Sequence, residues 1–105
     1  NKLRQVIASD PVRRWTVKSL ASHFGTSERT LQRRLADHSS SFSRIVSEAR
    51  LQVAAQHLCQ TRRAGLSEIG FLSGYTDQAH FTRSFKRGVG TTPRNYRASF
   101  MGSLA

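Results

Sequence analysis

The chain has 105 residues, of which 17 are Lys or Arg and 6 are Asp or Glu, so its net charge at neutral pH is +11. A chain of this length forms one domain or two very small ones. The basic excess favours a polyanionic partner: nucleic acid, an anionic membrane surface or an acidic protein. The single cysteine excludes an internal disulfide, and the sequence has neither a membrane span of about 20 apolar residues nor a signal peptide. We therefore expect a cytoplasmic protein and, because the chain begins with Asn1, a part of a longer one.

Apolar residues recur with a helical period along the whole chain, without strand-like alternation. The first predicted helix is short and ends before Pro11. Thr16 is a good N-cap for a second helix, and Trp15 and Leu20 have the spacing of a hydrophobic staple around it. Gly25 is predicted to end this second helix in a left-handed conformation.

Ser27 can cap a third helix that runs to about His38, after which three serines form a hinge. Residues 42–60 then read as one long helix, because a broad apolar face continues through them without Gly or Pro. At ~1.5 Å per residue this helix is ~28 Å long. Since successive major grooves on one face of B-DNA repeat every ~34–36 Å, such a helix can hold two DNA-reading units one helical turn apart.

Three shorter helices are predicted after the long one. A basic break over residues 61–65 ends at Gly65, which takes the N-cap place of the next helix. Pro93 fits the first position of the last helix, where its missing N–H costs little. The helices are expected at about residues 66–73, 77–87 and 93–100.

One pattern occurs twice: an apolar stripe, a glycine break, and a second stripe that holds an arginine. The copies are offset by 49 residues up to the glycine and by 50 after it. This layout is typical of a helix-turn-helix, whose turn often contains Gly. The first copy consists of Val17, Leu20, Ala21, Gly25, Leu31, Arg33 and Leu35, and the second of Leu66, Ile69, Gly70, Gly74, Phe81, Arg83 and Phe85. We predict an all-α fold of about seven helices that binds duplex DNA in two places, divided into a first helix-turn-helix unit (1–41), a linker helix (42–60) and a second unit (61–105).

The second copy also carries a long gapped motif, made of Gly74-Tyr75, Phe81-Thr82-Arg83-Ser84-Phe85-Lys86, Gly90-Thr91-Thr92-Pro93 and Tyr96-Arg97. This motif resembles the signature of the AraC/XylS family of bacterial transcription regulators. The resemblance extends from about Leu3 to Phe100. It implies seven helices, with the third and sixth in adjacent major grooves. It also implies a separate effector-binding and dimerisation domain outside these residues, and RNA polymerase is a further candidate partner.

Four positions depart from the family pattern without affecting its framework. Ser39 stands where glycine is frequent, so we expect strain in the turn before the long helix. Gly70 replaces a usual alanine and should loosen its helix by about 1 kcal/mol. His57 stands at a position that is often leucine, and Ala79 where a polar residue is common.

The candidate DNA-reading residues are polar and basic side chains opposite the apolar stripes. With Leu31 and Leu35 facing the core, the third helix presents its other face to solvent, and the same holds for the sixth helix with Phe81 and Phe85 inside. Arg suits guanine O6/N7 and Gln suits adenine N6/N7. The positions that match base contacts in the family are Arg29, Gln32, Arg33, Gln78, His80, Thr82 and Arg83. The alternative for Gln78 and Thr82 is a merely solvated helix face.

Phosphate contacts are expected from helix N-termini and flanking cations. The candidates are Ser27, Thr76, Lys86, Arg87, Arg94 and Arg97. Asp77 would repel phosphate and is predicted to be a cap. Arg94 and Arg97 have the alternative of packing their stems on the last helix. Arg50 lies inside the long helix and has the alternatives of pairing with Glu48 or Glu68 or of bonding carbonyl groups.

Two other functions compete with DNA binding. An enzyme is disfavoured because no motif couples the Ser, His and Asp residues, and Cys59 reads as a core residue. The four histidines are scattered, so we expect no metal site, and no Gly-rich phosphate loop or other sign of a cofactor is present. A module that binds RNA or an acidic protein surface fits the charge alone. The repeated helix-turn-helix spacing argues against RNA, whose deep groove excludes helices.

Overall fold

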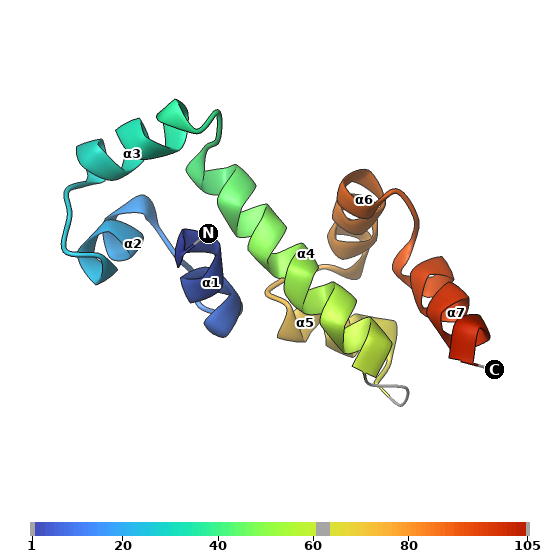
Figure 1. Ribbon diagram of the computed structural model, residues 1–105. Helices are drawn as coiled ribbons and strands as arrows, with labels where there is room; N and C mark the ends of the chain where they lie inside the picture. The colour runs from blue at the N-terminus through green and yellow to red at the C-terminus, as the bar shows by residue number, and fades with distance from the viewer. Residues whose placement is uncertain (1, 61–63, 105) are drawn as a thin grey trace.

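The computed structural model describes residues 2–60 and 64–104, with side chains up to residue 99. These residues form seven α-helices and no strand, as predicted (Figure 1). Of the basic break expected over residues 61–65, residues 61–63 lie outside the described residues. The helices are α1 Lys2–Ser9, α2 Val17–His23, α3 Glu28–Asp37, α4 Phe42–Gln60, α5 Leu66–Leu72, α6 Gln78–Val89 and α7 Pro93–Leu104.

The turn between α2 and α3 is fixed by local capping. The Thr16 hydroxyl accepts a hydrogen bond from the Ser19 N–H at 3.0 Å, and the Ser19 hydroxyl accepts one from the Thr16 N–H at 2.9 Å. Gly25 has a φ of +64°, and Ser27 accepts from the Thr30 N–H at 3.1 Å. These contacts satisfy backbone N–H groups that the helix starts would otherwise leave unpaired, so the predicted caps are confirmed.

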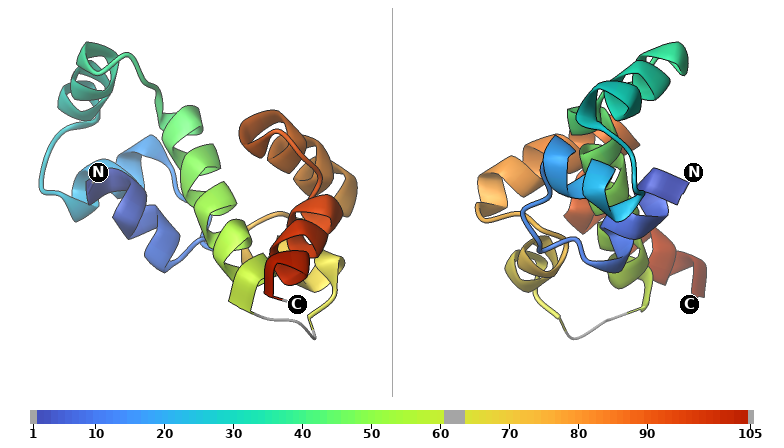
Figure 2. Two further views of the ribbon diagram at one scale, coloured as in Figure 1. Left: turned by 45° about the vertical axis from the view of Figure 1, so that its right-hand side comes forward. Right: turned by 90° about the vertical axis from the view of Figure 1, so that its left-hand side faces the viewer.

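The long helix α4 runs through the middle of the molecule, with α1–α3 on one side and α5–α7 on the other (Figures 1 and 2). Each half of α4 contributes to a different apolar core. Ile45 and Ala49 lie in the first core, whereas Ala54 and Leu58 lie in the second. The molecule is 48 Å long and 23 Å across in both other directions, so α4 separates two small units along its length.

The first core holds α1, α2 and α3 against the N-terminal half of α4. It is built from Ile7, Trp15, Leu20, Ala21, Leu31, Leu35, Ile45 and Ala49. Trp15 also donates from its indole nitrogen to the Asp10 carbonyl at 2.9 Å, which fixes the loop between α1 and α2. Glu48 pairs with Arg4 at 3.6 Å and with Arg44 at 3.4 Å, and the first of these ion pairs joins α1 to α4.

The second core is dominated by aromatic rings from α6, α7 and the turn before α6. Phe81 and Phe85 are fully buried, and their ring centroids are 5.9 Å apart. Tyr75 contacts Phe81 at 5.2 Å, and Tyr96 contacts Phe85 at 5.4 Å. The Phe81–Phe85 and Phe85–Tyr96 pairs are edge-to-face, an arrangement that adds about 0.5–1.5 kcal/mol per pair to the burial itself, so these rings help to hold the second unit together.

The glycine at position 70 has a packing reason that the sequence did not reveal. A Cβ atom built at Gly70 would lie 2.8 Å from Cδ2 of Phe81. The absence of a side chain therefore lets α5 and α6 approach closely. The expected loosening of α5 by Gly70 is thus accompanied by a packing role, because an alanine there would displace the Phe81 ring.

Two helices end later than the sequence predicts. The sixth helix continues from the predicted Arg87 to Val89, where Gly90, with a φ of +98°, donates its N–H to the Lys86 carbonyl at 2.9 Å. The last helix continues past Phe100 to Leu104, since no proline follows Pro93 to stop it.

Candidate nucleic-acid interface

Helix α3 exposes the three residues that the sequence assigns to base reading. Leu31 and Leu35 are buried in the first core, which turns the opposite face of the helix to solvent. Arg29, Gln32 and Arg33 are all exposed on that face. The predicted orientation of α3 is therefore confirmed, and its free face carries two guanidinium groups and one amide.

Helix α6 repeats this arrangement in the second unit. Because Phe81 and Phe85 are fully buried, the helix exposes Gln78, His80 and Arg83. Thr82 is half-buried, at the margin of this face. The His80 ring stands edge-on to Tyr75 at 5.4 Å, which restrains the imidazole near the start of the helix.

The starts of α3 and α6 differ in charge. Ser27 caps α3 with a neutral hydroxyl. Asp77 caps α6, and its carboxylate accepts hydrogen bonds from the N–H groups of Ala79 at 2.7 Å and His80 at 3.3 Å. Thr76, immediately before this cap, is exposed. Asp77 is thus the cap that the sequence predicts, and Ser27 and Thr76 lie at the two helix starts.

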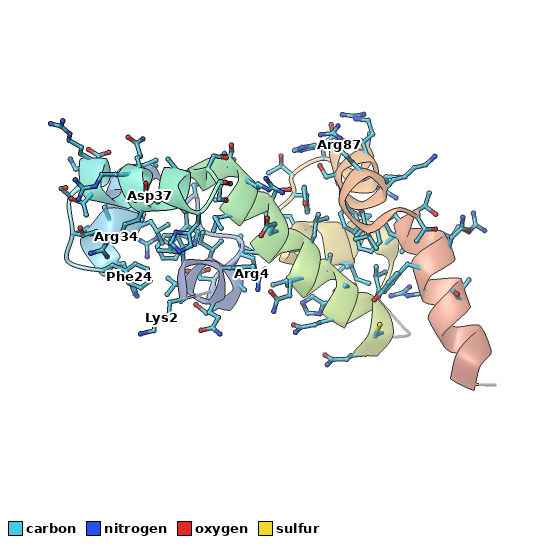
Figure 3. The ribbon with its side chains drawn as sticks, turned by 45° about the horizontal axis from the view of Figure 1, so that its top comes forward. Lys2, Arg4, Phe24, Arg34, Asp37 and Arg87 are labelled. Atoms are coloured by element: carbon cyan, nitrogen blue, oxygen red, sulfur yellow. The ribbon has the colours of Figure 1, made fainter. Side chains whose placement is uncertain are left out.

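The four predicted phosphate-binding cations lie in different surroundings. Lys86, Arg87 and Arg94 are exposed, and Arg87 lies at the edge of α6 (Figure 3), where it lines a hollow shared with α4. Arg97 is half-buried and donates to the carbonyl of Ala64 at 2.8 Å. The Arg97 guanidinium thus joins α7 to Ala64 at the start of the second unit, a structural contact that the sequence did not predict.

Arg50 makes neither of the carboxylate pairs considered for it in the sequence. Glu48 is paired with Arg4 and Arg44, and the Arg50 guanidinium instead lies 5.9 Å from the centroid of the Tyr75 ring. Its Nε is buried without a hydrogen-bond partner. Arg50 therefore lies on α4 at the point where α4 meets the turn of the second unit.

Both tyrosines of the chain remain protonated at neutral pH. Burial raises the pKa of Tyr75, although the nearby Arg50 charge and Ser84 oppose this shift. The hydrogen bond between Tyr96 and the Cys59 sulfur, with Sγ and Oη 3.8 Å apart, raises the pKa of Tyr96, and burial adds to the effect. Cys59 is thus half-buried against Tyr96, in a structural contact.

A pocket of about 150 Å³ lies between the two units. We call it the junction pocket, and its lining residues are Val12, Arg14, Arg50, Phe71, Gly74, Tyr75, Thr76 and His80. Sequence reasoning did not group these residues. They come from the α1–α2 loop, from α4 and from the α5–α6 region, so only the tertiary structure brings Arg14 and Arg50 together.

The described residues contain no group of three His, Cys, Asp or Glu side chains placed to hold a metal ion. No helix in the described part of the chain is long and apolar enough to cross a membrane.

A family model described as a helix-turn-helix domain matches residues 20–99 of the chain. A crystal structure from Chromobacterium violaceum, described as a transcriptional regulator of the AraC-type DNA-binding domain-containing proteins, superposes with a TM-score of 0.86 at 25% identity, over 93% of this chain and 88% of that one. The chain belongs to the AraC-type helix-turn-helix family. The resemblance found in the sequence is confirmed.

Two further relatives show how the AraC-type domain occurs elsewhere. The HTH-type transcriptional activator CfaD of Escherichia coli is 31% identical over 97% of this chain, which spans 38% of that protein. The DNA-binding domain of the global transcriptional factor AdpA, solved in complex with a target DNA, has the same fold, with a TM-score of 0.79 and 22% identity over 97% of this chain and 92% of that one. The chain thus spans less than half the length of CfaD.

Proposed function

We propose that this AraC-type domain binds duplex DNA sequence-specifically, with α3 and α6 in two adjacent major grooves, as the DNA-binding part of a bacterial transcription regulator. The observation that carries the proposal is the repeated exposure of polar and basic residues on the second helix of each unit, opposite a buried apolar stripe. The residues proposed to contact bases are Arg29, Gln32, Arg33, Gln78, His80, Thr82 and Arg83. The residues proposed to contact phosphates are Ser27, Thr76, Lys86, Arg87 and Arg94.

The dimensions of the molecule support two-groove binding. Its length of 48 Å exceeds the ~34–36 Å between successive major grooves on one face of B-DNA. The helix α4, with 19 residues, separates the two units and belongs to both cores. A single domain can therefore reach two grooves without a partner copy.

The net charge of +11 supports an electrostatic attraction to the phosphate backbone. The residues proposed to read bases are unlike on the two helices, with Arg29 and Arg33 on α3 but His80 and Arg83 on α6. We therefore propose that the domain binds as a monomer to an asymmetric site, whose two half-sites have different sequences.

The test combines selection from a random duplex library with single substitutions. Arg33→Ala should relax base preference in one half-site only, and Arg83→Ala in the other, because a bidentate base contact discriminates by about 1–3 kcal/mol. Arg34→Ala is the matched control for Arg33→Ala. Arg34 is the neighbouring arginine on α3, but it lines a hollow together with Leu3 of α1 and so does not belong to the proposed base-reading face. Arg87→Ala is the phosphate control and should weaken binding to all sequences alike.

Two outcomes would contradict the proposal. If Arg33→Ala and Arg83→Ala weakened all sequences equally, neither helix would read bases. If a duplex RNA competed as well as duplex DNA, the domain would instead be a basic module that binds RNA. Binding to an acidic protein surface is the other alternative.

The role in the whole protein is proposed on the same basis. We infer that the full-length protein is cytoplasmic, that an effector-binding and dimerisation domain lies outside these residues, and that RNA polymerase is a further partner. The proposal includes no enzymatic activity and no cofactor. Hydrolysis of a generic ester or phosphoester by the purified chain would contradict the proposed lack of enzymatic activity.

A further inference from the structure

The junction pocket is the place where the two helix-turn-helix units contact each other directly. Gly74, in the turn before α6, has a φ of +102°. A Cβ atom added there would clash with the carbonyl oxygen of Pro11 in the α1–α2 loop and lie 2.7 Å from Nε of Arg50. The backbone of the second unit therefore packs against the loop of the first at Gly74, which also lines the pocket.

The charged side chains that line the pocket are basic. Arg14 comes from the first unit, Arg50 from α4 and His80 from the second unit, and none of the eight lining residues is acidic. The nearest tyrosine, Tyr75, presents its ring to Arg50 and offers no negative charge below its raised pKa. The first unit and α4 thus each bring an arginine to one small cavity, and the second unit adds the imidazole of His80 as a hydrogen-bonding group.

Arg50 places a second guanidinium in the lining of the pocket, beside that of Arg14. Its Nε is buried beside Gly74, where a Cβ atom would lie 2.7 Å from it, so this nitrogen is closed to a ligand. The groups left to bind a ligand are the terminal nitrogens of the two guanidinium groups. An anion with several oxygen acceptors matches the fork of N–H groups on a guanidinium, and phosphate is the foremost example in recognition.

We propose that the junction pocket binds a phosphate of the DNA backbone, from the strand segment that crosses between the two major grooves. This inference rests on the proposed function. DNA that passes from α3 to α6 must cross the space between the units, and the pocket lies in that space, beside Thr76 and His80 at the start of α6. Val12 and Phe71, which are 48% and 59% exposed, form an apolar rim suited to the faces of the neighbouring sugars.

A phosphate held in this way has a consequence for specificity. It is bound by both units and by α4 together, so it fixes the register of one half-site relative to the other. It carries no base information itself, because phosphate contacts position a protein and base contacts specify the sequence.

The experiment uses the chain of residues 1–105 and its selected duplex site. Each phosphate between the two half-sites is replaced singly by an uncharged methylphosphonate, and the affinity is measured by fluorescence anisotropy. Neutralising one central phosphate should weaken binding of the unchanged chain by about tenfold, as for the loss of one charge-assisted contact. Arg14→Ala should weaken binding to the unmodified duplex by a similar factor, without a change in base preference.

The two changes should not add when they are combined. Arg14→Ala should lose clearly less affinity than the unchanged chain when the critical methylphosphonate is introduced, because Arg50 is then the remaining guanidinium at the pocket. Arg34→Ala is the matched control, because Arg34 lies beside Phe24 in the first unit (Figure 3), away from the pocket. Arg34→Ala should remain sensitive to the methylphosphonate. Arg50→Met, checked by thermal unfolding for an intact fold, is the second test of the same coupling.

The outcomes separate the possible failures. If no central methylphosphonate weakens binding while both grooves are protected in footprints, this inference is wrong and the proposed function stands. If the chain does not bind duplex DNA, the proposed function fails first. A pocket for a free anion would instead show saturable binding of inorganic phosphate that Arg14→Ala abolishes, with no effect of the methylphosphonates, and that result would also overturn the inference.

Discussion

Ser39 is the non-glycine residue with a left-handed backbone among the described residues, with a φ of +55° between α3 and α4. The strain expected at this position from the sequence is thus located in the structure. Its N–H donates to the carbonyl of Ala36 at 2.9 Å, which holds the turn in place. A side chain in this conformation is unfavourable because its Cβ approaches the following carbonyl oxygen.

Ser39→Gly should therefore stabilise the domain. We expect a gain of about 0.5–1 kcal/mol, after allowing for the greater freedom of glycine in the unfolded chain. For a chain of this size the midpoint of thermal unfolding should rise by about 2–8 °C. Circular dichroism measures it, and Ser39→Ala is the control that keeps the strained backbone and should give no gain. Equal midpoints for the glycine and alanine variants would show that the turn is not strained.

Other single residues show where sequence reasoning reached its limit. The caps Thr16, Ser27 and Asp77 could be predicted, because a capping bond joins residues that are two or three positions apart. The roles of Gly70 and Arg50 could not. Gly70 packs against Phe81 of another helix, and Arg50 against the ring of Tyr75 in the turn before α6, and no local spacing encodes either contact.

At the scale of the element, α6 combines a recognition face with a start that carries a negative charge. The Asp77 carboxylate satisfies two backbone N–H groups, but it also lies at the end of the helix that is proposed to approach the phosphates. A cap can be kept while the charge is removed, because Asn accepts the same hydrogen bonds as Asp.

Asp77→Asn should therefore leave the fold intact and tighten DNA binding. The loss of the favourable carboxylate–helix-dipole interaction should lower stability by less than about 1 kcal/mol. Affinity for duplex DNA at low salt should rise by about two- to fivefold, as for removal of one exposed like charge, and the gain should shrink at high salt. Anisotropy titrations at two salt concentrations measure both effects.

The matched control is Asp37→Asn, at the last residue of α3 (Figure 3). Recognition helices contact base edges with their N-terminal residues, so Asp37 lies at the far end. Its replacement should give a smaller gain than that of Asp77. An equal gain would mean that only the net charge matters, and that the start of α6 is not directed at the DNA.

The elements themselves were largely predictable, and their ends less so. The bounds of α4 were predicted correctly because an uninterrupted apolar face is a long-range signal within one helix. The ends of α6 and α7 were predicted too early: the helices end at Val89 and Leu104. A helix end depends on its cap and its packing as well as on propensity.

At the scale of the whole molecule, the relative placement of the two units could not be predicted from the sequence pattern. The repeat predicts two helix-turn-helix units, but the contact of Gly74 with Pro11 is what sets one against the other. Together with the continuous helix α4, this contact makes the two recognition faces parts of one body rather than modules on a flexible tether.

This rigidity predicts how the selected DNA site responds to insertions between its half-sites. Five added base pairs turn the second half-site to the opposite side of the duplex, and affinity should fall by at least about 100-fold, because the base contacts of one unit are lost. Ten added base pairs restore the side but move the half-site by another ~34 Å. The two grooves are then ~68 Å apart, beyond the 48 Å length of the molecule, so the second insertion should not restore the affinity.

Anisotropy titrations with the three duplexes, and footprints of each complex, measure this response. The unmodified site should show two protected grooves and each insertion only one. A chain whose units were joined flexibly would recover affinity and both footprints with ten added base pairs, because the linker would extend to the new spacing. That recovery would contradict a fixed Gly74–Pro11 contact, and with it the single register that the junction pocket is proposed to impose on the DNA.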